Sequence, residues 1–303
     1  MRVLVTGVAG FLGRYIARSF AEQGYEVVGI DSSSPENAPL ANLSSYYPLR
    51  LPDSYLGEIL KQHQIQLCIH SAGRASVNFS VDNPASDFSA GPLLTFDILN
   101  TLRVSAPECR FIFLSSAAIY GNPTTRPIRE DHPIAPLSPY GFHKLQSELI
   151  CQEFNKVYGM RTASLRIFSA YGPGLRRQVI WDICQKALTK HVVTLQGTGQ
   201  ESRDFIHATD IAKAVTVVAK FTPMEGEVYN VASGRETTIA ELANMILAAL
   251  GLNLTPQFDG VVPPGTPLNW QANITRLEAY GFTPTIPLED GLKTFVEWCK
   301  REL

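Results

Sequence analysis

Cysteine is scarce in this sequence, and the cysteines present follow no motif. There are five, Cys68, Cys109, Cys151, Cys184 and Cys299, all far apart and none in a C-x-x-C pair. This spacing argues against a disulfide framework and against a zinc site. We therefore expect a reducing compartment and no bound metal.

An excess of charge and a long apolar run are also missing. The chain has 26 Lys and Arg against 28 Asp and Glu, a formal net charge of -2, so we expect no nucleic-acid partner. The longest uncharged run, 242–258, is broken by Asn, Thr, Gln and Pro, whereas a membrane span needs about 20 mostly apolar residues. The opening "MRVLVTGVAG" is typical of a strand and not of a signal peptide. We expect a cytoplasmic protein with no membrane partner.

Short apolar runs alternate with amphipathic stretches over the first half of the chain. This alternation predicts an α/β fold, a Rossmann-type doubly wound parallel sheet with a smaller C-terminal α/β substrate-binding domain. We expect residues 1–168 to form the cofactor domain, with a returning segment near 204–232, and residues 169–303 to form mainly the substrate domain. The expected strands are 2–7, 26–31, 66–73, 109–121 and 161–168, and the expected helices are 11–24, 56–63, 93–104 and one that opens at 140.

Three glycines lie between the first predicted strand and helix, in "VTGVAGFLG". Gly7 permits a tight turn, Gly10 lets the backbone approach a pyrophosphate, and Gly13 lets helix and strand pack closely. Asp31 closes the next strand, where its carboxylate would accept hydrogen bonds from a ribose and repel a 2′-phosphate. These residues predict a dinucleotide site that prefers NAD to NADP. The alternative for Asp31 is a turn residue in "DSSSPEN".

Tyr140 and Lys144 stand four residues apart in "SPYGFHKLQSE", at the start of a predicted helix. An ammonium beside a phenol favours the phenolate, so we expect Lys144 to lower the pKa of Tyr140. Such a tyrosine exchanges a proton with a substrate hydroxyl. Ser115 and Ser116 end a nearby strand, and either could hydrogen-bond the substrate oxygen.

The order of several motifs resembles that of the NAD-dependent nucleotide-sugar epimerases and dehydratases, which are extended short-chain dehydrogenases/reductases. The similar segments run along nearly the whole chain: "VTGVAGFLG", "HSAG", "LSSAAIYG", "SPYGFHK", "RIFSAYGPG", "RDFIHATDIA" and "YNVASG". The resemblance implies a catalytic triad of Ser116, Tyr140 and Lys144, with Lys144 also holding the nicotinamide ribose. It implies a nucleotide-sugar substrate.

The resemblance also implies the remaining binding residues. For NAD they are Gly7, Gly10, Phe11, Leu12, Gly13, Asp31, Ser32, Leu51, Ala72, Gly73, Tyr140 and Lys144. For the substrate they are Arg74, Ser116, Ser169, Arg176 and Arg203, where Arg203 would grip the diphosphate. Arg203 could instead be an ordinary loop arginine, and Arg74 could form a surface salt bridge. A homodimer is implied as well, through the helices around 93–102 and 146–158.

Departures from the family pattern reduce the number of reactions that this chain is expected to catalyse. Dehydratases of the family carry Asp and Glu where this chain has Ala117 and Ala118, so elimination of water is disfavoured. The simplest interpretation is a 4-epimerase that passes through a 4-keto-sugar. A 4-keto-sugar reductase that uses NAD(P)H is the alternative, and a non-catalytic NAD-binding protein is a third.

Other departures concern the binding residues. Ser169 and Gly91 replace family asparagines, and Arg50 near the adenine site leaves NADP open. We expect His70 to have a core role and His143 to face away from the site.

Overall fold

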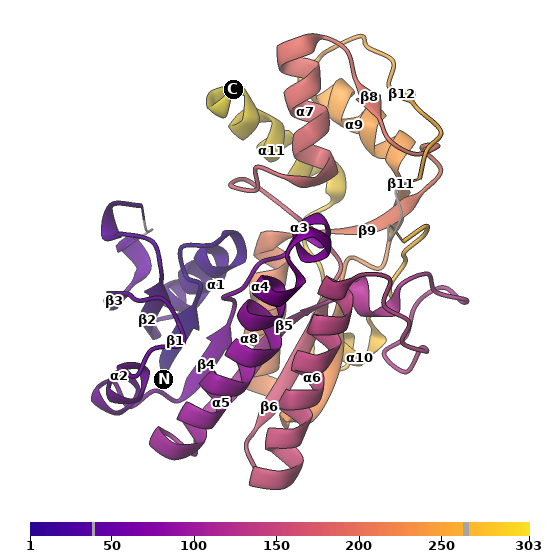
Figure 1. The fold of residues 1–303 in the computed structure, drawn as a ribbon. Coiled ribbons are helices and arrows are strands. Elements are labelled where there is room, and N and C mark those ends of the chain that lie inside the picture. The colour runs from indigo at the N-terminus through magenta and orange to yellow at the C-terminus, as the bar shows by residue number, and fades with distance from the viewer. Residues whose placement is uncertain (38–39, 263–266) are drawn as a thin grey trace.

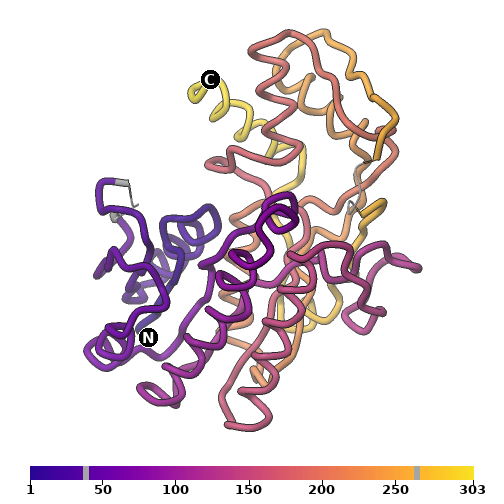
Figure 2. Tube along the Cα trace, in the orientation of Figure 1, coloured from indigo at the N-terminus to yellow at the C-terminus, as the bar shows by residue number. Residues whose placement is uncertain are grey.

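The computed structural model describes residues 1–37, 40–262 and 267–303, and Figure 2 draws the others in grey. Its larger lobe is built on seven parallel strands in the order β10-β6-β5-β4-β1-β2-β3. These strands are β1 (Arg2–Thr6), β2 (Glu26–Asp31), β3 (Ser45–Pro48), β4 (Leu67–His70), β5 (Arg110–Ser116), β6 (Thr162–Ile167) and β10 (Glu225–Val231).

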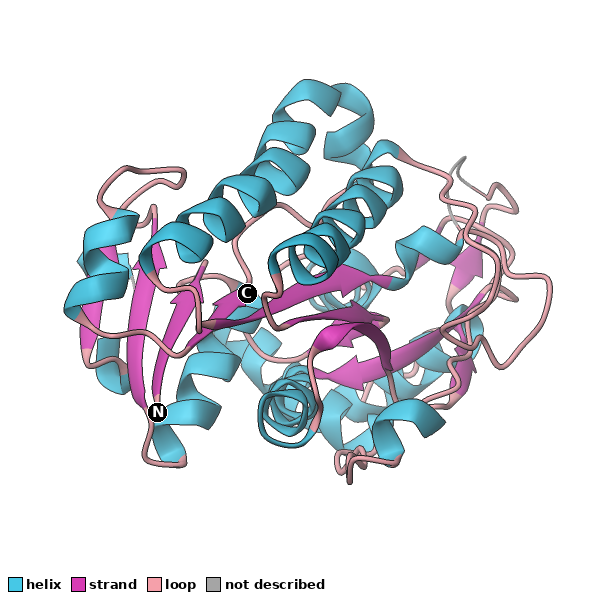
Figure 3. Ribbon diagram, turned by 90° about the horizontal axis from the view of Figure 1, so that it is seen from below, coloured by secondary structure: helices cyan, strands magenta, loops and turns pink. Residues whose placement is uncertain are grey.

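Helices cover both faces of this sheet, as the view along its edge shows (Figure 3). The two faces bury alternate residues of each strand, because side chains of a strand point to opposite sides. Val3 and Val5 belong to one core cluster, and Leu4 between them belongs to the other. One face carries α1 (Phe11–Glu22) and α8 (Ala208–Phe221), and the other carries α2 (Leu56–Gln62), α5 (Leu94–Ser105) and α6 (Pro139–Tyr158). The predicted fold class is confirmed.

The smaller lobe lies beyond the carboxyl ends of the sheet strands (Figure 1). Its three long helices, α7 (Gln178–Lys190), α9 (Ile239–Leu250) and α11 (Leu288–Glu302), share one apolar core. A three-stranded sheet joins the lobes, formed by β7 (Ser169–Tyr171), β9 (Ser202–His207) and β11 (Glu236–Thr238), and β8 (Thr194–Leu195) pairs with β12 (Gln257–Phe258). Strand β10 and helix α8 belong to the larger lobe although they follow α7 in sequence. The exact domain boundaries stay a prediction.

Local sequence explains why α6 starts and stops where it does. The Ser138 hydroxyl accepts a hydrogen bond from the Gly141 N–H, and Pro139 occupies the first helical position. Gly159 ends the helix with φ +68°, a left-handed conformation that glycine adopts freely. This frame fixes the position of Tyr140 in the first turn.

The predicted strand over 109–121 is wrong at its C-terminal end. The strand ends at Ser116, and a 3₁₀ turn, η4 (Ala117–Tyr120), follows, with the Ser116 hydroxyl accepting from the Ala118 N–H. Alternating apolar residues hide this change, because a strand and a tight turn can both bury them. The bend places Ser116 at the carboxyl edge of the sheet, where ligands bind in such folds.

Several short elements lie outside the sequence-based expectation. They are too short or too interrupted to give a periodic signal. They are η1 (Pro35–Asn37), η2 (Leu40–Asn42), α3 (Val77–Asp82), α4 (Pro84–Phe88), the π-helical turn η3 (Ser89–Leu93) and α10 (Thr275–Glu278). Among the described residues, no helix has both the length and the apolar character that a membrane span requires.

Candidate active site

The glycine turn between β1 and α1 has no room for side chains. Gly7 has φ +68°, and a Cβ there would lie 2.7 Å from the backbone of Ala72. A Cβ on Gly13 would lie 2.2 Å from the Gly7 carbonyl oxygen. A Cβ on Gly10 would lie 3.0 Å from that same oxygen. The predicted reasons for Gly7 and Gly13 are therefore met, since turn and helix packing both require the missing side chain.

The start of α1 suits an anion. Gly10 caps the helix without a side chain, and the first turn carries no acidic residue. The N–H groups of the first helical turn, which includes Phe11, Leu12 and Gly13, have no partner within a helix and lie at its positive end. NAD fits this turn, because its pyrophosphate needs close backbone approach and N–H donors.

Asp31 ends β2 beside the same turn. One carboxylate oxygen accepts from the Ala9 N–H at 3.1 Å, and the other accepts from the Ser33 N–H at 2.9 Å. These bonds hold the carboxylate at the turn, where a ribose would lie. Asp31 is therefore a turn residue that lies beside the candidate cofactor site, and its role toward a ribose stays a prediction.

The other residues assigned to the cofactor lie along the same edge of the sheet or just beyond it. The Ala72 N–H donates to the Thr6 hydroxyl at 3.3 Å, and Gly73 has φ +127°. Ser32 is exposed and Leu51 is half-buried. No contact within the chain tests whether these four touch NAD, and their role stays a prediction.

Ser116 and Tyr140 are brought together from different elements. Ser116 ends β5 and Tyr140 lies in the first turn of α6, and the Ser116 side chain is close enough to the Tyr140 phenol to lower its pKa by hydrogen bonding. The Tyr140 N–H also donates to the Ser80 hydroxyl at 3.0 Å. The backbone of Tyr140 is therefore anchored on α3, and its phenol lies beside Ser116.

Lys144 lies one helical turn after Tyr140, with its ammonium directed at the sheet. Its Nζ donates to the Leu114 carbonyl oxygen at 2.8 Å, and lies 4.7 Å from the centre of the Phe113 ring. The same nitrogen is 5.8 Å from the centre of the Tyr140 ring. The predicted neighbourhood is present, but the hydrogen bond goes to a carbonyl oxygen instead of the phenol.

The predicted lowering of the Tyr140 pKa is wrong for the structure as it stands. Burial raises the pKa of Tyr140, the hydrogen bond from Ser116 and the charge of Arg177 oppose this, and Asp87 adds to it. Burial also lowers the pKa of Lys144 to about 8, against the opposing charges of Asp87 and Glu148. Desolvation is thus the largest cause of the pKa shift of both groups, and Lys144 is not among the charges that act on Tyr140.

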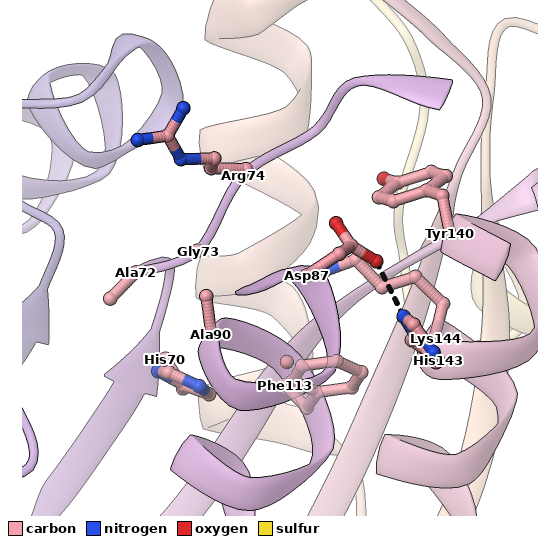
Figure 4. Close-up of a pocket in the computed structure, with 11 residues that line it drawn as sticks. His70, Ala72, Gly73, Arg74, Asp87, Ala90, Phe113, Tyr140, His143 and Lys144 are labelled. Carbon is pink, nitrogen blue, oxygen red and sulfur yellow. Dashed lines mark hydrogen bonds and ion pairs between the residues drawn. The ribbon is translucent and has the colours of Figure 1, made fainter. Parts of the chain in front are cut away.

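Two residues that the sequence-based interpretation left out belong to this site (Figure 4). Asp87 of α4 and His143 of α6 line the same pocket as Tyr140 and Lys144, and Asp87 Oδ2 lies 2.5 Å from His143 Nδ1. The expectation that His143 faces away is wrong. The sequence did contain a signal for His143. Residues 140, 143 and 144 have the i, i+3, i+4 spacing that places side chains on one face of a helix.

His70 forms part of the wall of this pocket. Its Nδ1 is 2.8 Å from the Thr6 hydroxyl, and burial, with the charge of Lys144, lowers the pKa of the imidazole to about 3. A histidine that stays neutral and bonds to the core fits the expected structural role.

Two arginines flank the pocket. The Arg74 guanidinium stacks over the Phe79 ring at 4.3 Å and points away from Tyr140 and Lys144 (Figure 4). Arg177, at the start of α7, donates to the Ala75 carbonyl oxygen and acts electrostatically on Tyr140. Both arginines follow the "YGPG" motif, and the substrate residues predicted from the sequence included Arg176 and not Arg177.

The remaining substrate candidates lie on the sheet that joins the lobes or beyond it. Arg203 of β9 donates to the carbonyl oxygens of Ser202 and Leu268 and lies 5.5 Å from the Trp270 ring. Ser169 of β7 pairs with Phe205 of the same strand β9. Arg176 forms an ion pair with Glu302 of α11, so the structure does not bring it to the pocket.

Comparison with known proteins agrees with this arrangement. The model of the NAD dependent epimerase/dehydratase family matches residues 3–232. A protein of Methanocaldococcus jannaschii, provisionally named a UDP-glucose 4-epimerase, is 32% identical over 98% of both chains.

Two solved structures match the whole chain. The UDP-glucose 4-epimerase of Thermotoga maritima, solved with UDP-glucose, has a TM-score of 0.91 and 28% identity over 100% of this chain and 99% of the other. The UDP-glucuronic acid 4-epimerase of Bacillus cereus, solved with its substrate and NAD, has a TM-score of 0.91 and 25% identity over 100% of both chains. The chain belongs to the NAD dependent epimerase/dehydratase family, and its cofactor is NAD.

Proposed function

We propose that this enzyme is a 4-epimerase of a UDP-linked hexose or hexuronic acid. The observation that carries the proposal is that Ser116 acts on the Tyr140 phenol and is followed in the chain by two alanines, Ala117 and Ala118. The pair can move a hydroxyl proton, and the alanines supply no further acid or base at that position. Epimerisation needs the transfer of the hydroxyl proton and does not need a further acid or base.

The chain's own residues would carry the proton. Tyr140 accepts the proton of the C4 hydroxyl and later returns it, and the Ser116 hydroxyl bonds to the same substrate oxygen. The Lys144 ammonium stabilises the phenolate form that Tyr140 must have before it accepts the proton and again after it returns it. NAD, when bound, supplies the reversible oxidation of the sugar carbon. No net proton is gained or lost, because donor and acceptor are the same phenol.

Elimination of water would need an additional acid and base near C5 and C6. The dehydratase-type carboxylates are missing from the strand end, where Ala117 is fully buried and Ala118 is half-buried. An alanine methyl group cannot exchange a proton, so the keto-sugar has no route to dehydration at these positions.

The nucleotide is inferred from the relatives and from Arg203. The two related structures named above hold UDP-glucose and UDP-glucuronic acid. Arg203 lies in the sheet between the lobes and carries a planar guanidinium that suits a diphosphate. Its present partners are neutral carbonyl oxygens, which leaves its charge available to an anionic ligand.

The test is direct incubation with candidate substrates. We would add UDP-glucose, UDP-glucuronic acid and UDP-N-acetylglucosamine separately to the purified protein, with and without added NAD, and follow the sugar signals by NMR. A stable mixture of two C4 epimers from any of them is the expected result. No epimer in any arm would overturn the proposal, and turnover only of a 4-keto-sugar with NADH or NADPH would replace it with the reductase.

A further inference from the structure

A buried acid and a histidine stand beside Tyr140 and Lys144, and the proposed reaction does not yet use them. The side chain of Asp87 is 4% exposed and that of His143 is 13% exposed, and their bonded atoms are 2.5 Å apart. Both line the pocket that also holds Tyr140 and Lys144. Burying a charged carboxylate costs free energy, so the place of Asp87 in this pocket points to a functional use.

The geometry fixes which atom carries the proton. A carboxylate can only accept, so the hydrogen bond to Asp87 requires a proton on His143 Nδ1, whatever the charge of the ring. The imidazole is also held by its surroundings, because the Phe88 ring packs edge-on at 5.5 Å. His143 therefore orients the Asp87 carboxylate, which points from α4 toward the α6 side chains (Figure 4).

The other carboxylate that acts on Lys144 is already engaged by a different partner. Glu148, on the same helix, makes a bidentate ion pair with Arg166 and accepts from the Ser115 hydroxyl. Its charge is thus largely neutralised by a buried guanidinium. Asp87, whose partner is an imidazole, is the stronger counter-charge for Lys144, and it comes first among the charges that raise the pKa of this lysine.

The remaining titratable groups that face the couple are few. His70 of β4 is neutral over the working range of pH, because burial lowers its pKa to about 3. Burial raises the pKa of Cys151 on α6, which keeps this thiol uncharged. Arg177 at the start of α7 is the cation that acts on Tyr140, and Arg74 after β4 lines the pocket.

We propose that Asp87 and His143 are positioning residues of the active site: the Asp87 carboxylate, oriented by His143, is the buried counter-charge that keeps Lys144 an ammonium beside Tyr140. This inference rests on the proposed function for its catalytic meaning. The charge relation itself exists in the protein without substrate, so it can be measured separately.

The first experiment compares Asp87→Asn with the wild-type protein and with Asp82→Asn. Asp82 ends α3 and is exposed, so its substitution makes the same change of charge outside the pocket. Lysine labelled with ¹³C at Cε is titrated by NMR, with Lys144 assigned from Lys144→Met. We expect the Lys144 midpoint to fall by about one pH unit in Asp87→Asn and to stay unchanged in Asp82→Asn.

The pH profile of turnover gives the catalytic readout. The ammonium is lost as pH rises through the Lys144 pKa, so a lower pKa moves the alkaline fall of kcat to lower pH. We expect this limb to shift in Asp87→Asn by the same amount as the NMR midpoint. An active wild-type enzyme with an unmoved Lys144 midpoint and an unmoved alkaline limb would overturn the inference. An inactive wild-type enzyme would overturn the proposed function and leave the titration as the test of the charge relation.

Two substitutions of His143 test its orienting role. Asn keeps an N–H donor near the position of Nδ1, whereas Leu keeps the bulk and removes the donor. We expect His143→Asn to retain the wild-type Lys144 midpoint and His143→Leu to lower it. If Asp87→Asn does not fold, His143→Leu carries the test, and an unchanged midpoint in that variant contradicts the proposal.

Discussion

The glycine turn and the arginines of the substrate side shape their parts of the site by different means. At the turn, the backbone itself forms the surface, and a single added Cβ at Gly13 would come within 2.2 Å of a carbonyl oxygen. The arginines predicted to bind substrate already have partners, which are Glu302 for Arg176 and two carbonyl oxygens for Arg203. A site made of backbone excludes variation, whereas a site made of long side chains can exchange partners when a ligand arrives. The cofactor end should therefore be rigid and intolerant of substitution, and the substrate end adaptable.

Tyr140→Phe should have the largest effect, because the residue stands where the two ends meet. Removal of the hydroxyl leaves the ring packed but removes the proton carrier, so we expect kcat to fall about 10²- to 10⁴-fold. Steady-state kinetics on the substrate found by the panel measures this. Tyr158→Phe, on the exposed end of the same helix, is the matched control, and a Tyr140→Phe enzyme as active as this control would remove Tyr140 from the mechanism.

Gly13→Ala tests the rigid end. The methyl group has nowhere to go, so helix α1 and the turn must move apart, at a cost of about 1–3 kcal/mol in the free energy of unfolding. We expect weaker NAD binding in calorimetry together with the lower stability in urea. Gly57→Ala is the control, because its Cβ would meet only the tip of the Ser105 side chain at 3.0 Å. Equal behaviour of the two variants would show that the turn is not the rigid element we describe.

Arg203→Ala and Arg176→Ala compare two arginines of the adaptable end. We expect Arg203→Ala to raise KM about tenfold or more, because a charged hydrogen bond to a ligand contributes about 1.5–3 kcal/mol. Arg176→Ala removes an exposed ion pair, worth about 0–1 kcal/mol, and should change KM little. A larger effect at Arg176 would mean that this side chain leaves Glu302 and binds substrate.

Disruption of the predicted homodimer should have the smallest effect on catalysis. Exposed apolar side chains lie on the two expected helices: Phe96 of α5 is 40% exposed, and Leu149 and Val157 of α6 are 53% and 66% exposed. We expect two chains in sedimentation equilibrium for the wild-type protein and one for Leu149→Asp, with kcat within a factor of a few. A wild-type monomer would show that these side chains do not serve a dimer of this kind.

The sequence predicted the larger lobe well because its signals are local. Alternating strands and helices, the strand–turn–helix context of Gly7 and Gly13, and the spacing of Tyr140 and Lys144 all act over a few residues. These features also carried the resemblance that placed Ser116 at the strand end. Sequence alone therefore sufficed for the fold class, the family and the cofactor.

The missing parts depend on contacts between distant segments. Asp87 contacts His143, which lies 56 positions later in the sequence. Helix α4, which carries Asp87, is too short to give a periodic sequence signal. The pKa of Tyr140 depends on how much solvent the fold removes, which the spacing of Tyr140 and Lys144 does not reveal. The partner of Arg176 lies on the last helix. These three features depend on burial and on contacts between distant segments, and a local motif predicts neither of them.

The most direct test of the account follows the hydrogen on C4. In the proposed reaction Tyr140 handles only the hydroxyl proton, and the carbon-bound hydrogen leaves and returns without meeting water. We would supply the nucleotide sugar identified by the panel with deuterium at C4, in ordinary water, and examine both epimers by NMR and mass spectrometry. Full retention of deuterium at C4 in the product is the predicted result. Loss of the label to solvent would contradict the account, because it would require an acid or base to act on the carbon itself.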